Sequence, residues 1–133
     1  MKIENHYFNH IKKFVNLQLY KLQKIREMGT EFILVLTTIE KYLNAVQIAK
    51  VLIAEKLAAC CTILQNATSF YEWQGALEDR KENVLLIKTT KVKFEALRNR
   101  IVELHTDKVP EIISVKIDDG LKEYLSWVEA TTM

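Results

Sequence analysis

The stretch from residue 59 to residue 90, ACCTILQNATSFYEWQGALEDRKENVLLIKTT, decides the fold. Ala59 to Trp73 is β-like in composition, Gln74-Gly75 supplies a turn, and Asn83 to Thr90 returns as a second strand. At about 3.3 Å per residue the first arm reaches roughly 50 Å, whereas a typical strand has about five or six residues. Much of each arm must therefore pack against something outside its own subunit. The pattern predicts an oligomer and leaves the number of subunits open.

The segments on either side of this hairpin complete a β-α-β-β-α-β order. Residues 31–38 form a short apolar run that is typical of a buried strand. Thr37-Thr38-Ile39-Glu40 has capping-box spacing, so a helix is predicted to begin there and to end near Lys56. Apolar spacing predicts a second helix over 94–104, a strand over 112–117 and a short C-terminal helix over 121–128. The fold class is therefore α+β, a ferredoxin-like sandwich whose antiparallel sheet carries both main helices on one face.

A composition break at Met28-Gly29-Thr30 divides the chain into a leader, residues 1–28, and a body, residues 29–133. Apolar residues recur in the leader at spacings of three and four among basic and polar ones, which predicts an amphipathic N-terminal helix. Its basic face could touch an anionic membrane or nucleic acid, but packing on its own protein is the simpler interpretation. Met28 could also be the natural start of the compact domain. His6 and His10 of the leader could bind copper by themselves.

Charge and cysteine usage limit the class of protein. The chain has a net charge of +2, but the body alone carries 13 Lys/Arg against 15 Asp/Glu. A slightly acidic body argues against nucleic-acid binding. Cys60 and Cys61 are neighbours that cannot form an unstrained disulfide, which favours a reducing, cytoplasmic location. The apolar runs are too short for a membrane span.

Five segments of the body follow one another in a familiar order. They are Glu55–Cys60, Ser69–Gly75, Glu82 with Leu85–Thr89, His105 with Val109–Ile113, and Tyr124–Trp127. Together they resemble the CutA divalent-cation-tolerance family over about Phe32 to Val128. The resemblance implies a ferredoxin-like fold and a tight homotrimer, related in shape to PII-type signalling trimers. It also implies a link to copper and other divalent metals, and no established catalytic reaction. The leader lies outside the family's usual span.

The resemblance also implies candidate metal ligands. In copper-binding members a Cys at the end of the first strand and a His pair before the Pro-Glu are implicated; here these positions hold Thr37 and Leu104-His105. The body has no C-x-x-C or H-x-x-x-H spacing from which a chelate could be predicted. His105, helped by carboxylates such as Glu111, is expected to bind copper or another divalent cation only weakly, because a tight copper site needs several imidazole or thiolate ligands. The alternative is that His105 caps or packs at a helix end, and this is the simpler interpretation. No cofactor is expected to be required.

Tyr71, Trp73, Glu82 and Lys88 form a second candidate site. Tyr71 and Trp73 share one face of a strand, Glu82 and Lys88 share a face of the returning strand, and Tyr71 is expected near Glu82 across the turn. A Lys with a carboxylate and aromatic walls can bind a small anion or polar ligand between subunits. A structural ion pair at a subunit contact is the alternative, and we favour it.

The pattern together with the resemblance predicts a homotrimeric, non-enzymatic accessory protein in the response to divalent metal ions, and the trimer and the metal role come from the resemblance alone. Neither cysteine has a base positioned to activate it, and the chain has no Gly-rich phosphate loop. Two alternatives stay open. One is a PII-like sensor that binds a small anionic metabolite between subunits. The other is an enzyme that uses Lys88 and Glu82 in an intersubunit cleft.

Overall fold

The computed structural model describes residues 2–27 and 29–133, and the chain divides into two compact units, Met1–Thr30 and Glu31–Met133. This division falls two residues after the predicted end of the leader. The first unit holds the long helix α1 (Lys2–Glu27), which contains the predicted amphipathic helix. All of its described side chains, residues 5–20, are exposed. Most of the apolar ones lie on one side of α1, because Tyr7, Phe8, Ile11, Phe14, Val15 and Leu19 recur at spacings of three and four.

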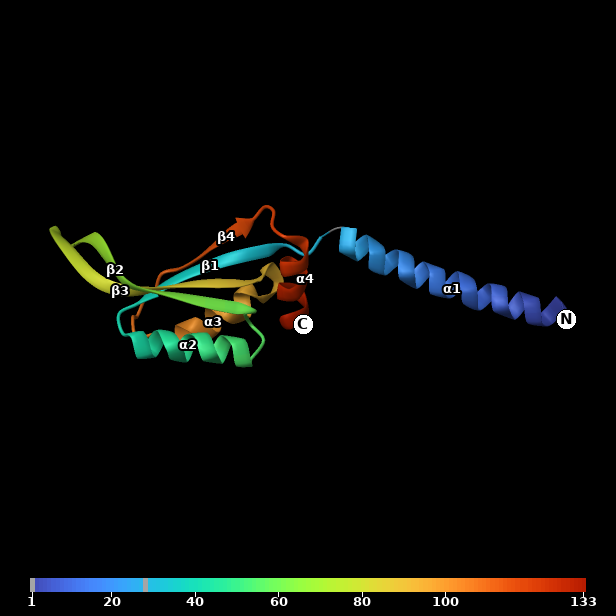
Figure 1. Cartoon of the computed structure of the whole chain (residues 1–133), viewed down its shortest axis with the longest axis horizontal. Helices are drawn as coiled ribbons and strands as arrows, with labels where there is room; N and C mark the ends of the chain where they lie inside the picture. The colour runs from blue at the N-terminus through green and yellow to red at the C-terminus, as the bar shows by residue number, and fades with distance from the viewer. Residues whose placement is uncertain (1, 28) are drawn as a thin grey trace. The chain divides into compact units, whose positions relative to one another are not determined.

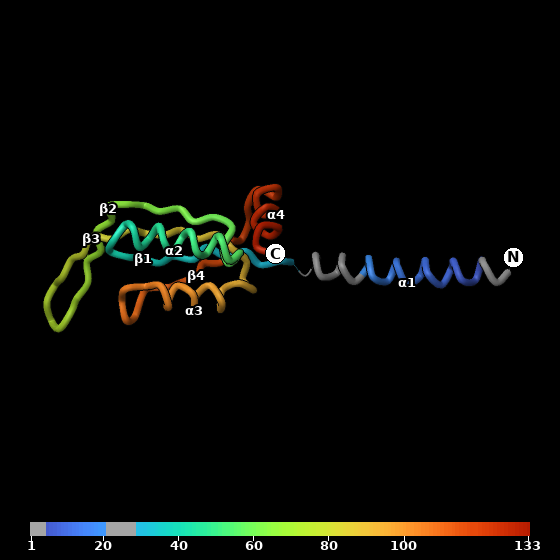
Figure 2. The backbone as a smooth tube through the Cα atoms, turned by 90° about the horizontal axis from the view of Figure 1, so that it is seen from below, coloured from blue at the N-terminus to red at the C-terminus, as the bar shows by residue number. Residues whose placement is uncertain are grey.

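The second unit is an antiparallel sheet with helices on one face. Its elements are β1 (Phe32–Ile39), α2 (Tyr42–Ala54), β2 (Cys60–Trp73), β3 (Ala76–Thr90), the 3-10 turn η1 (Lys91–Lys93), α3 (Phe94–Leu104), β4 (Ile112–Ile117) and α4 (Lys122–Thr131). The strand order is β2-β3-β1-β4, and every neighbouring pair is antiparallel. Figures 1 and 2 show α2 and α3 along the same face of the sheet, with α4 at one end. The predicted α+β, ferredoxin-like fold is confirmed.

The core lies between the sheet and the two helices, because alternate residues of each strand point to this side. In β1, Ile33, Val35, Thr37 and Ile39 are buried, while the alternate residues Leu34, Leu36 and Thr38 are only half-buried. On α2, Ala45, Ile48 and Leu52 recur at spacings of three and four and form the buried stripe. Leu97 and Ile101 do the same for α3. The opposite face of β1 and β4 remains partly open, and there Ile113 and Val115 are about half exposed.

The β2–β3 hairpin extends well beyond the rest of the sheet (Figure 1). β1 pairs with β3 only over Asn83–Thr90, so residues 76–82 pair with β2 alone. At about 3.3 Å per residue this free arm is roughly 20 Å long. At its tip Gln74 and Gly75 have φ of 50° and 79°, the two positive values that a two-residue type I′ turn requires.

Two predicted boundaries are wrong. The return strand begins at Ala76 rather than at Asn83, because the two-residue turn lets the ladder start at once with Trp73 opposite Ala76. The first helix begins at Tyr42 rather than within Thr37–Glu40. β1 continues to Ile39, which is fully buried and pairs with Asn83, so tertiary pairing overrides the capping-box spacing. The residue before α2, Lys41, makes no side-chain cap.

Candidate functional site

A polar network lies where the hairpin arm leaves the sheet. Arg80 and Glu82 are two residues apart on β3 and therefore share a face, with Ser69 of β2 directly opposite Arg80. The Arg80 guanidinium donates from Nε to Glu82 Oε1 at 2.8 Å and from Nη2 to Asp107 Oδ2 at 2.8 Å. Ser69 Oγ donates to Glu82 Oε2 at 2.7 Å. The network joins the arm to the loop between α3 and β4.

The charges of this network satisfy one another. Burial raises the pKa of Glu82, whose side chain is only 7 % exposed, but hydrogen bonds from Ser69 and Arg80 and the charge of Arg80 outweigh burial. The net pKa of Glu82 is therefore lowered. The hydrogen bond from Arg80 likewise lowers the pKa of Asp107 and, chiefly through Asp107, raises that of Arg80 itself. All three groups stay ionised at neutral pH, as a structural ion-pair cluster does.

The structure brings the two predicted metal ligands, His105 and Glu111, to the same residue, Thr38 at the end of β1. His105 Nε2 lies 2.7 Å from the Thr38 carbonyl oxygen, and the Asp107 backbone N–H donates to His105 Nδ1 at 2.9 Å. Because Nδ1 accepts, the proton belongs on Nε2, which donates to Thr38. Thr38 Oγ1 donates to Glu111 Oε2 at 3.3 Å. Both imidazole nitrogens are thus in use, and a metal ion would have to displace one of these bonds.

The remaining positions of the implied copper set add no soft ligand. Thr37 is fully buried on the core side of β1, and its hydroxyl has no hydrogen-bond partner among the described residues. Leu104 packs against the core at the end of α3. Within residues 2–27 and 29–133, no group of three or more His, Cys, Asp or Glu side chains comes together. The donors of the body therefore do not fit a tight copper site.

The second predicted site does not form within one chain. Tyr71 pairs with Glu78, and Glu82 pairs with Ala67, so the expected proximity of Tyr71 and Glu82 is wrong. The turn places Trp73 opposite Ala76, and this fixes the partner of every arm residue up to the bulge at Gln65–Asn66. Glu82 and Lys88 are six residues apart on β3, about 20 Å.

Lys88 instead belongs to a small cluster at the other end of the hairpin. Its Nζ lies 2.7 Å from Thr62 Oγ1 and 3.6 Å from Cys60 Sγ, both on β2. Burial and the neighbouring Cys60 raise the pKa of the Tyr124 phenol, which places α4 against this cluster. Burial, with a smaller contribution from Cys60, also raises the pKa of the Cys61 thiol to about 12. Cys61 is therefore a neutral, half-buried thiol and not an activated nucleophile.

Sequence reasoning missed Arg80 and Asp107. The pair Arg80 and Glu82 carries a signal, since opposite charges two residues apart in a strand share one face. Asp107 carries none, because its contact with Arg80 spans 27 residues of sequence. The spacing of His6 and His10 was also missed: they are four residues apart on α1, and their ring centroids are 5.9 Å apart.

The strand order and the long β2–β3 hairpin define the class of the body as a ferredoxin-like α+β domain. Comparison with known proteins makes the class specific. The family model of the CutA1 divalent ion tolerance protein matches residues 33–131. The divalent-cation tolerance protein CutA of Thermus thermophilus is 43 % identical over 98 residues, which cover 74 % of this chain and 95 % of that protein.

Solved structures agree with this assignment. CutA from Xylella fastidiosa superposes with a TM-score of 0.75 at 40 % identity, covering 77 % of this chain and 98 % of its own. The periplasmic divalent cation tolerance protein CutA of Archaeoglobus fulgidus superposes with a TM-score of 0.74 at 33 % identity, covering 77 % and 99 %. The chain belongs to the CutA1 divalent ion tolerance family. No described helix is long and apolar enough to cross a membrane.

Proposed function

We propose that this protein is a homotrimeric, non-enzymatic accessory protein in divalent-cation tolerance, working in the cytoplasm. Membership of the CutA1 family carries the link to divalent cations. The cytoplasmic location rests on two free cysteines, which suit a reducing compartment. The non-enzymatic role rests on the site itself, where the ionisable groups at the root of the arm are paired with each other.

The free arm is the observation that supports assembly. Phe70, Trp73 and Leu77 on the arm are 68 %, 62 % and 79 % exposed. Ile113 and Val115 add apolar surface on the open face of β4. Covering apolar surface yields about 25 cal/mol per Å², so arms and open faces of neighbouring copies stabilise each other when they meet. The trimeric number comes from the family resemblance.

Light scattering of the purified chain at micromolar concentration tests the assembly. We expect a mass about three times the 15.5 kDa of one chain. Trp73→Ser is expected to weaken the assembly because it removes an exposed aromatic side chain from the arm. The matched control is Glu72→Ser, the neighbouring exposed position on the other face of β2. A monomer mass for the unchanged chain would contradict the proposal.

We further propose that the body binds Cu(II) only weakly, through His105 and Glu111. Both contact Thr38, but His105 must give up a hydrogen bond before it can coordinate an ion. Calorimetric titration of a chain carrying His6→Ala and His10→Ala isolates the body. We expect weak binding that His105→Ala reduces further. Tight stoichiometric binding that survives His105→Ala would show that the metal site lies elsewhere in the body.

One observation favours the PII-like sensor as a second candidate. Lys88 is half-buried, and in the described part of the chain its Nζ contacts the Thr62 hydroxyl and the Cys60 sulfur but no carboxylate. An ammonium group in this setting suits a small anion brought by a ligand between subunits. A thermal-shift screen against anionic metabolites tests this. A metabolite that raises the melting temperature of the unchanged chain but not of Lys88→Met supports the sensor. If no metabolite has such a Lys88-dependent effect, the sensor is contradicted and the accessory role is retained.

A further inference from the structure

We propose that His6 and His10 on α1 form a two-imidazole site for a transition-metal dication such as Zn(II), Ni(II) or Cu(II). The site lies outside residues 33–131, which the family model matches. It is argued from α1 alone and stands independently of the function proposed for the body.

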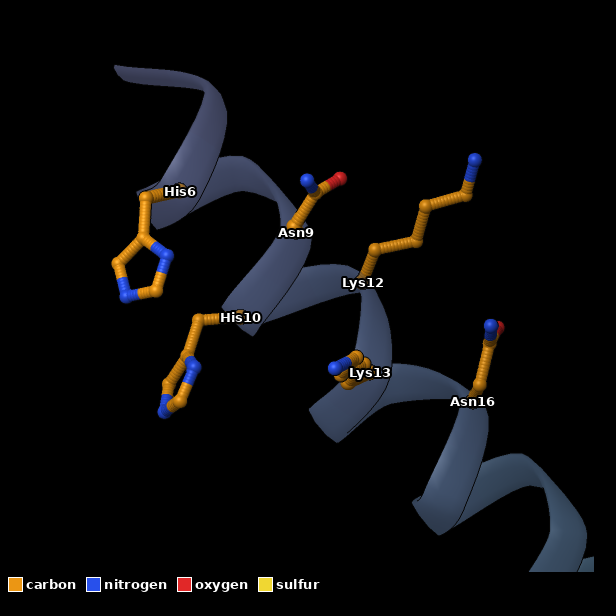
Figure 3. Close-up of a pocket in the computed structure, with 6 residues that line it drawn as sticks. All are labelled: His6, Asn9, His10, Lys12, Lys13 and Asn16. Atoms are coloured by element: carbon orange, nitrogen blue, oxygen red, sulfur yellow. The ribbon is translucent and has the colours of Figure 1, made fainter. Parts of the chain in front are cut away.

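The spacing of the two histidines is the first support. Residues four apart in a helix lie one above the other, about 6 Å apart along the axis. Figure 3 shows both rings projecting from the same side of α1, one turn apart. Both side chains are exposed, and neither ring makes a hydrogen bond or ion pair to another described residue. The nitrogens are therefore available to an ion from solvent.

The distance between the rings is the second support. A zinc–imidazole bond is about 2.0–2.1 Å long, which puts the ion about 3 Å from the ring centroid. Two rings on one ion therefore have centroids about 5 to 6 Å apart. The centroids of His6 and His10 are 5.9 Å apart, with the planes tilted by 33°. Small rotations of two exposed side chains then bring both nitrogens to a shared ion.

The surroundings select the kind of ion. Residues 5–20 contain no Asp or Glu, and the same polar side of the helix presents Asn9, Lys12, Lys13 and Asn16. A hard cation such as Mg(II) or Ca(II) requires carboxylate oxygens that this surface lacks. Imidazole suits zinc, nickel and copper. The nearby lysines repel any cation, so the affinity for the metal ion must come from the two imidazole nitrogens. Water fills the remaining coordination positions.

The contrast with the body strengthens the assignment. The chain has three histidines in all, and His105 has both nitrogens engaged by Thr38 and Asp107. His6 and His10 are therefore the imidazoles that can coordinate without breaking a bond of the fold. We place the stronger transition-metal site of this chain on α1.

Calorimetric titration of the full chain with Zn(II) at neutral pH tests the site, together with electron paramagnetic resonance of the Cu(II)-loaded chain. The informative variant exchanges two residues, His10→Lys with Lys12→His, and so keeps the composition. It moves the second imidazole to a position about 9 Å from His6 along the axis and about 120° around it. We expect this exchange to weaken Zn(II) binding about tenfold or more, because the second nitrogen no longer acts at a high effective concentration.

Two further variants test which histidines bind the ion. His6→Ala with His10→Ala is expected to weaken binding at least as much as the exchange, with the helical circular dichroism unchanged. His105→Ala is expected to leave Zn(II) affinity as it is. In the unchanged chain, the Cu(II) spectrum should show two coordinated imidazoles, and in the exchange variant one. Equal Zn(II) affinity in the exchange variant and the unchanged chain would overturn the proposal, whatever the mass of the assembly.

Discussion

Replacing Arg80 by Met is expected to destabilise the body by leaving Glu82 without its cation. Glu82 is 7 % exposed and accepts two hydrogen bonds from Arg80, while Ser69 keeps a third bond in the variant. Removing one partner of a buried ion pair costs about 3–5 kcal/mol. Because Arg80 is 29 % exposed and Ser69 remains, we expect about 2 kcal/mol at pH 7.

The pH dependence gives this prediction a distinct signature. The folded pKa of Glu82 is lowered, so its contribution to stability is present above the unfolded pKa and is lost as the pH falls through the folded one. In Arg80→Met, burial is no longer offset by Arg80, and the pKa of Glu82 rises. Protonation then relieves the buried charge. The stability gap between the variant and the unchanged chain should therefore shrink between pH 7 and pH 4.

Urea unfolding followed by circular dichroism, at one fixed protein concentration, measures both effects. Lys81→Met is the matched control, since Lys81 is exposed on the other face of the same strand. It should change stability by no more than about 0.5 kcal/mol. Glu82→Gln removes the charge but leaves Arg80 its bond to Asp107, so about 1 kcal/mol is expected. An Arg80→Met cost equal to that of Lys81→Met, or a gap that is constant with pH, would refute the reasoning.

Three further predictions follow from single features. A chain that begins at Met28 should keep its melting temperature and assembled mass, because the core lies within Glu31–Met133; loss of the assembly would contradict this. Cys61 should resist iodoacetamide at pH 8, because its pKa is about 12, and peptide mass mapping would detect rapid alkylation if this is wrong. Gly75→Ala should cost about 1 kcal/mol in urea unfolding, because Gly75 has a φ of 79°; no cost would mean that the turn readjusts.

The body's element order could be predicted from sequence because its signals are local. The apolar run of residues 32–36 and the three-four spacing of residues 94–104 correspond to β1 and α3. Local spacing misled where a tertiary contact competed with it. Thr37–Glu40 reads as a helix start, yet pairing with β3 keeps Thr38 and Ile39 in the strand.

The candidate site was harder to predict because it depends on register. Once Gln74 and Gly75 form the turn, Tyr71 must face Glu78, and the sequence alone could have shown this. Other contacts could not be predicted in this way. The bulge at Gln65–Asn66 shifts β2 by one residue against β3. Asp107 bonds to Arg80 across 27 residues of sequence and His105 bonds to Thr38 across 67, so no local spacing predicts either contact.

The body and the leader differ in which of their potential ligand side chains are already paired, and this difference indicates where a divalent cation binds. In the body, Arg80 is bound by Glu82 and Asp107, and Arg100 is bound by Glu55 and Glu103. Carboxylates held in this way have little capacity left for a cation. The leader has the opposite character, with exposed imidazoles and no carboxylate within residues 5–20. If the body assembles as we propose, it gathers several leaders in one particle and raises the effective concentration of their imidazoles. Assembly through the arm and cation binding on α1 would then reinforce each other without any metal ligand in the core.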